Sequence, residues 1–164
     1  MLTVTLDTNT LGLVSVLEVL GDAEADLTTT TVTAREVEGT KWAEHVKTLK
    51  LTTEDFVLGE SRLGEARLGD PETAKRYEQL LSLLSGGGFP KAGQRGSLTD
   101  GQKRLQRDAM ILSAHARDGR DIFVSNDTKA IGQPGSGLRR RLQERFGIRA
   151  MTLEEFKDHC ASLR

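Results

Sequence analysis

The sequence predicts a single α/β domain over residues 1–164, with a central parallel β-sheet and helices on both faces. Short β-prone runs alternate with amphipathic helical patterns along the chain, which is typical of parallel sheets. A length of 164 residues suits one domain. Apolar residues make up 37% of the chain and charged residues 29%, which indicates a globular protein and not a disordered one.

The first predicted strand covers residues 2–6, where apolar residues alternate with threonine. This strand ends at Asp7. The polar run 8–10 supplies side chains that cap helices. It precedes residues 11–20, where leucine and valine recur at helical spacing. The N-terminal region is therefore predicted to contain one strand and one helix.

A second strand is predicted over residues 26–31, which are strongly β-prone. Thr33 is followed three residues later by Glu36, which matches a capping box and predicts a helix to about residue 49. Residues 52–55 are also typical of a helix start. Pro71 favours a further helix, because proline is common at the first helical position.

The second half has clearer punctuation. A glycine-rich stretch over about residues 85–97 is predicted to be a flexible loop within the domain. After it we expect alternating helices and strands with capping residues at their ends. The predicted order is a helix over 100–118, a strand over 121–125, a helix over 137–146, a strand over 148–151 and a helix from Thr152.

Cysteine content and hydropathy bear on the cellular compartment. Cys160 is the only cysteine, so no disulfide within the chain is expected, and a reducing, cytoplasmic compartment is the natural expectation. The longest apolar stretch, 11–20, is too short to cross a bilayer, and no secretion signal is recognisable. We therefore expect no membrane association.

The charge is unevenly distributed. Residues 1–82 carry 8 Lys and Arg against 15 Asp and Glu, whereas residues 83–164 carry 15 against 9. The basic second half is typical of a protein with a polyanionic partner. The alternative is that these charges are scattered over solvated faces.

Two of the predicted strands lead into carboxylates. Asp7 follows the first strand and Asp127 follows the strand over 121–125. Parallel strands end at one edge of their sheet, where ligands bind in such folds, so we expect both acids there. The alternative for each is a helix cap.

Two further acids are candidates for the same edge. Asp108 lies in the middle of a predicted helix, beside its apolar face, where a carboxylate is costly unless it is paired or binds a metal. Ion pairing with Arg104 or Arg107 is the alternative explanation. Glu36 is the fourth acid, with the capping box as its alternative role. Four carboxylates would form a set of hard oxygen ligands, which suits Mg²⁺ or Mn²⁺.

Five sequence blocks resemble those of the PIN-domain ribonuclease family. Four are signature blocks and the fifth closes the chain: LDTNT at 6–10, TVTAREVEGT at 31–40, RDAMILSAHA at 107–116, FVSNDTKAI at 123–131 and IRAMTLEEF at 148–156. Their order and spacing cover nearly the whole chain. The resemblance implies a parallel sheet flanked by helices and a Mg²⁺- or Mn²⁺-dependent endoribonuclease activity.

The resemblance also implies roles for individual residues. The acidic quartet of the family falls on Asp7, Glu36, Asp108 and Asp127, as metal ligands and catalytic groups, with Glu38 as the alternative second acid. Supporting polar positions fall on Thr8, Asn9 and Asn126.

RNA is the expected partner of the basic half. The candidate phosphate-binding residues flank the predicted acids, and a solvated helix face is their alternative role. They are Lys103, Arg104, Arg107, Arg139, Arg140 and Arg141. Alternatives for the whole chain are the toxin component of a toxin–antitoxin pair, bound by a small antitoxin protein, and a catalytically silent module that binds RNA or protein. Homo-oligomer formation stays open.

Overall fold

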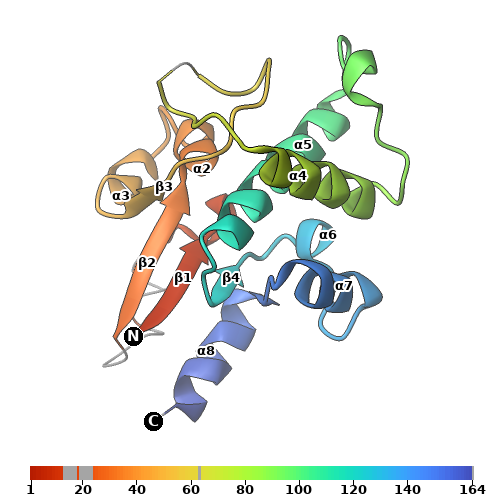
Figure 1. Cartoon of the computed structure of the whole chain (residues 1–164). Coiled ribbons are helices and arrows are strands. Elements are labelled where there is room, and N and C mark those ends of the chain that lie inside the picture. The colour runs from red at the N-terminus through yellow and green to blue at the C-terminus, as the bar shows by residue number, and fades with distance from the viewer. Residues whose placement is uncertain (13–17, 19–23, 63, 164) are drawn as a thin grey trace.

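The computed structural model of the chain describes residues 1–12, 18, 24–62 and 64–163 (Figure 1). It contains a five-stranded sheet, all parallel, in the order β3-β2-β1-β4-β5. The strands are β1 (Leu2–Leu6), β2 (Ala25–Thr30), β3 (Lys50–Thr52), β4 (Ile122–Val124) and β5 (Ala150–Met151). The predicted α/β class with a parallel sheet is therefore confirmed.

Helices surround this sheet along most of the chain. Short 3-10 turns are η1 (Thr8–Thr10) and η2 (Ala92–Gln94). The α-helices are α2 (Thr31–Glu36), α3 (Ala43–Val46), α4 (Pro71–Leu84), α5 (Asp100–Arg117), α6 (Thr128–Ile131), α7 (Gly137–Phe146) and α8 (Leu153–Ser162). Figure 1 shows α5 crossing the sheet with α4 beside it.

Two apolar cores separate along the alternation of the strands. Ile122 and Val124 of β4 pack in one cluster with Phe156 of α8. Phe123, between them in the strand, packs in the other cluster with residues of α4, α5 and α7. Successive side chains of a strand point to opposite faces, so each face of the sheet has its own helical cover. This confirms the prediction of helices on both faces.

The predicted helix over 33–49 is wrong. The helix α2 already ends at Glu36, and its cap is Thr30, whose hydroxyl accepts a hydrogen bond from Thr33 N at 3.2 Å. Gly39 has a positive φ of 74°, and the chain turns there before α3. Glu36 therefore stands at the end of its helix and not in its first turn.

The predicted helix start at 52–55 is also wrong. Residues 50–52 form β3 by pairing with β2, where Thr30 lies opposite Thr52. Asp55 then forms an isolated parallel bridge with Arg67, which closes the excursion between them. A three-residue edge strand has too little periodicity to be recognised locally, and its pairing is a tertiary event. The predicted helix over 11–20 lies mostly outside the described residues.

The helices of the second half agree closely with prediction. Pro71 opens α4, and Gly147 ends α7 in the left-handed conformation. Thr152 caps α8 through a capping box with Glu155. The stretch 85–97 forms only turns and η2. No helix in the described ranges is long and apolar enough to cross a membrane.

Candidate functional site

The adjacent strands β1 and β4 end together and bring two of the predicted acids to one edge of the sheet. Leu6 lies opposite Val124, and Asp7 N donates to Val124 O at 3.0 Å. Ser125 Oγ donates to Asp7 Oδ2 at 2.6 Å and accepts from Asp127 N at 3.0 Å. Ser125 thus connects the two acids. We did not single it out from the sequence, although its position directly after the strand is an available signal.

Asp7 is held rigidly. Its side chain is 8% exposed and accepts hydrogen bonds from Thr8 N at 2.8 Å and from Asn9 Nδ2 at 3.1 Å, in addition to Ser125. Burial raises the pKa of Asp7 above its ordinary value, opposed by the hydrogen bonds from Ser125 and Thr8. The charges of Glu36 and Asp127 raise that pKa further. Asp7 is therefore a fixed carboxylate in a negative environment.

The asparagines at the two predicted polar positions connect loops. Asn9 Oδ1 accepts from Asn126 N at 2.7 Å, and Asn126 Oδ1 accepts from Leu153 N at 3.0 Å. They tie η1, the segment after β4 and the start of α8 together. Asp127 caps α6 by accepting from Lys129 N at 2.9 Å. The helix-cap explanation for Asp127 is thus realised, and it coexists with its place beside Asp7.

Glu36 and Glu38 occupy different surroundings. Thr8, next to Asp7, donates a hydrogen bond from its hydroxyl to Glu36 Oε2. Glu38 instead forms a two-pronged ion pair with Arg62, at 2.7 Å for each hydrogen bond. Of these two glutamates, the structure therefore places Glu36 with the other acids.

Asp108 projects toward the same acids from the middle of α5. Burial raises its pKa to about 7, and the charges of Asp7, Asp127 and Glu36 add to the rise, while Arg104 counteracts it. The alternative role, an ion pair with Arg104 or Arg107, is not formed among the described residues. Asp108 and Asp127 line a common cavity of about 240 Å³.

Arg107 has its own partner, because its Nε donates to Glu60 at 3.0 Å. Together with Lys103 it lines a second cavity, of about 460 Å³, which also contains Glu36. Arg104 lines the cavity with Asp108. The three predicted cations of α5 therefore lie beside the acids.

The arginines of α7 lie elsewhere. Arg139 donates to Glu155 at 2.6 Å and to Gly132 O at 3.0 Å, so it joins α7 to the start of α8. Arg139 and Arg140 line a separate cavity of about 340 Å³. Arg141 is exposed, and its Nε donates to Gly137 O. The structure does not bring this group together with the four acids.

The four acids differ from other carboxylates in their pairing. Among the described residues, buried and exposed carboxylates such as Glu54, Asp55 and Glu155 have arginine partners. Within the same ranges, no ion pair involves any of the quartet, Asp7, Glu36, Asp108 and Asp127. Their negative charge is left to be balanced by something other than the chain.

Oxygen donors and unbalanced charge suit a hard divalent cation. As arranged here, no three or more His, Cys, Asp or Glu side chains of the described residues gather closely enough to enclose a metal ion. Mg²⁺ does not require such a cage, because it commonly keeps several waters and uses one or two carboxylates. The donor set therefore fits a partly hydrated ion, held by few direct ligands.

No protein-family model matches this chain, and no curated protein matches it. Functional inference consequently depends on the fold, the placement of these side chains and the sequence blocks described above.

Proposed function

We propose that this protein is a Mg²⁺- or Mn²⁺-dependent endoribonuclease whose site lies at the ends of β1 and β4. One observation carries the proposal: four carboxylates from β1, α2, α5 and the β4–α6 segment face one region, and no cation of the described chain pairs with them. Unbalanced charge of this kind is costly to the fold, and such costs concentrate where function requires them.

Asp7 and Asp127 would be the first ligands of the metal, because Ser125 fixes both at the edge of the sheet. Asp108 and Glu36 would complete the acidic set. When bound, the metal supplies an activated water and stabilises the leaving oxygen of the phosphodiester. Asp7 keeps its orientation through Thr8, Asn9 and Ser125, so it reorganises little during the reaction.

Cations near the acids support a polyanionic substrate. Lys103 and Arg104 are exposed on α5, one turn or so before Asp108, and no ion pair of either is formed among the described residues. Phosphate contacts by such side chains supply most of the affinity that does not depend on base sequence. Aromatic residues are only 4% of the chain, so base stacking is a minor contributor. The resemblance to PIN-domain ribonucleases adds RNA as the substrate class.

The direct test is cleavage of a structured RNA panel with Mn²⁺, with Mg²⁺ and with excess EDTA, with the new ends mapped. We expect cleavage only with metal, leaving 5′-phosphates. Asp127→Asn should abolish it, while Asp158→Asn, on the exposed part of α8, serves as the matched control. Full activity in EDTA, or full activity of Asp127→Asn, would contradict the proposal. Metal-independent RNA binding without cleavage would instead favour a silent module.

A further inference from the structure

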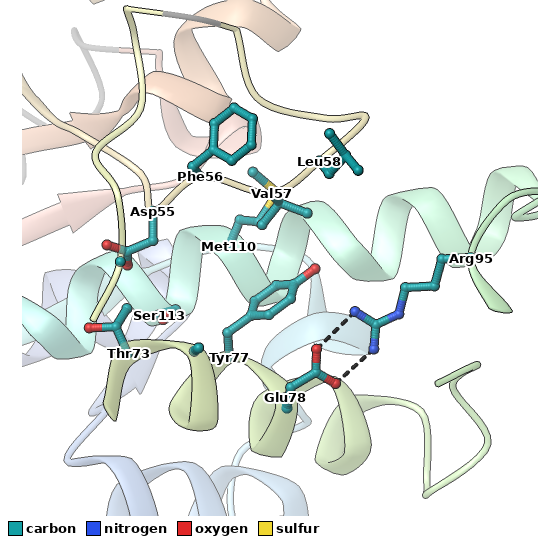
Figure 2. A pocket seen from close by; sticks show the side chains of 12 residues that line it. Asp55, Phe56, Val57, Leu58, Thr73, Tyr77, Glu78, Arg95, Met110 and Ser113 are labelled. Atoms are coloured by element: carbon teal, nitrogen blue, oxygen red, sulfur yellow. Dashed lines mark hydrogen bonds and ion pairs between the residues drawn. The ribbon is translucent and has the colours of Figure 1, made fainter. Parts of the chain in front are cut away.

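A second cavity of interest lies on the other side of α5 from the acids. It measures about 270 Å³ and is enclosed by α4, α5 and residues 55–58 (Figure 2). Met110 and Ser113 of α5 line it. At 3.6 residues per turn, these two positions point away from Asp108 on the same helix. The cavity is therefore separate from the proposed nuclease site.

Three polar side-chain atoms of this cavity's lining residues have no hydrogen-bond partner. They are Tyr77 Oη, Ser113 Oγ and Asp55 Oδ2. Tyr77 is 8% exposed and Ser113 is 2% exposed, so water does not replace the missing partners freely. Figure 2 shows the Tyr77 hydroxyl directed into the space between the 55–58 segment and Arg95. A buried polar group without a partner costs about 1–3 kcal/mol, and native proteins contain few of them.

Gln106 is the competing explanation for Tyr77. It lies near the phenol and counteracts the rise in the pKa of Tyr77, which burial brings to about 12. The two side chains do not, however, meet hydrogen-bond geometry. A phenol with so high a pKa stays protonated at neutral pH and keeps its proton available as a donor.

The charges at the cavity are already balanced. Asp55 Oδ1 pairs with Arg117 Nη1 at 2.9 Å, which leaves only the other oxygen of Asp55 unpartnered. Glu78 and Arg95 form a two-pronged ion pair, with hydrogen bonds of 2.8 and 2.7 Å, drawn as dashed lines in Figure 2. A ligand with a net charge would gain no counter-charge here, so a neutral molecule fits better.

Size and lining define the ligand further. Cavities for drug-sized molecules begin at about 300 Å³, so a volume just below that admits one or two rings. Phe56, the Tyr77 ring and the thioether of Met110 provide an apolar wall that favours an aromatic partner. Asp55 Oδ2 can only accept, whereas the two hydroxyls can donate or accept.

We propose that this cavity is a binding site for a small, neutral, one- or two-ring aromatic heterocycle that carries an N–H donor. The N–H would face Asp55, and the hydroxyls of Tyr77 and Ser113 would meet the remaining polar edge. This site is independent of the proposed nuclease function and of its metal.

The test titrates the full chain with indole, benzimidazole and adenine by saturation-transfer NMR, with 1-methylindole as the matched probe that lacks the N–H. At least one N–H probe is expected to bind, and 1-methylindole should bind at least about threefold more weakly than indole if indole is that probe. Backbone amide shifts should concentrate in α4, α5 and residues 55–58. Binding by none of the three N–H probes, or shifts confined to other regions, would overturn the proposal.

Two variants separate a ligand role from a structural one. Tyr77→Phe and Ser113→Ala remove hydroxyls that have no partner, so each should leave the melting temperature unchanged or raised, while weakening probe binding about 3–10-fold. Ser82→Ala, an exposed hydroxyl deletion on α4, should change neither. Metal-dependent RNA cleavage should be unaffected by Tyr77→Phe. If both cavity variants lower the melting temperature and leave probe affinity intact, the hydroxyls serve the fold and the proposal fails.

Discussion

Replacing Asp108 with asparagine should stabilise the metal-free protein at neutral and alkaline pH while abolishing RNA cleavage. The asparagine nearly preserves the shape of the side chain and removes one of four mutually repelling charges. No hydrogen bond or ion pair of Asp108 with the described residues is lost in the exchange. The variant therefore isolates the electrostatic cost of the acidic set.

The size of the effect follows from the pKa. Burial, then the charges of Asp7, Asp127 and Glu36, raise the pKa of Asp108 from 3.8 to about 7. Holding the charged form in the folded state thus costs up to about 4 kcal/mol. Solvent screening of a partly exposed carboxylate reduces this, so we expect about 2–4 kcal/mol, or about 5–15 °C in melting temperature for a domain of this size.

The effect has a defined pH window. Between about pH 4 and pH 7 the folded protein retains a proton on Asp108 that the unfolded chain has already released. The stability of the wild type therefore falls as pH rises through this window, and the loss is complete above about pH 7. The difference between Asp108→Asn and wild type should vanish near pH 4.

The assay is a thermal melt of both proteins from pH 4 to pH 8.5, in EDTA and with Mn²⁺. Asp158→Asn, an exposed carboxylate of α8, is the control and should leave the melting temperature unchanged. Mn²⁺ should raise the melting temperature of the wild type more than that of Asp108→Asn, because a ligand stabilises only as far as the site binds it. If the variant melts well below wild type in EDTA at pH 8, Asp108 is a structural partner and this reasoning is wrong.

Three further substitutions test other parts of the structure. Glu36→Gln should reduce metal-dependent cleavage by about 100-fold or more, whereas Glu38→Gln should change it little; equal effects in a cleavage assay would refute the assignment of Glu36 to the acidic set. Glu54→Gln should lower the free energy of unfolding in urea by about 3–5 kcal/mol, because Glu54 is fully buried and pairs with Arg35 at 2.6 Å; a loss below about 1 kcal/mol, as expected for the exposed pair of Glu38, would show that the buried pair contributes little. Burial lowers the pKa of His115 from 6.5 to about 4, so the wild type should lose about 3 kcal/mol between pH 7 and pH 4 that His115→Gln retains; parallel pH profiles of unfolding for the two proteins would rule this out.

Several elements were predictable because their signals are local. Pro71 at the start of α4, Gly147 after α7 and the capping box at Thr152 each satisfy backbone groups within a few residues. The predicted helix over 33–49 failed for the complementary reason. Residues 50–52 become β3 only because β2 is present to pair with them. Intrinsic preference is weak in so short a segment, and tertiary pairing overrides it.

The acids show the same division. The positions of Asp7 and Asp127 follow from the ends of predicted strands, since parallel strands share one carboxyl edge. Which glutamate joins them does not follow, because Glu38 is removed by Arg62, a residue 24 positions away. Such a pair depends on where the intervening loop places the arginine.

The sequence by itself determined the α/β class, most element boundaries in the second half and the four candidate carboxylates, because short-range periodicity and capping carry that information. Only the tertiary structure decided how charges are paired. It committed Arg139 to Glu155 and Arg107 to Glu60, and it enclosed the unpartnered Tyr77 hydroxyl beside α5. Ion pairs and cavities depend on contacts between distant segments, and the energy of those contacts exists only once the segments have packed.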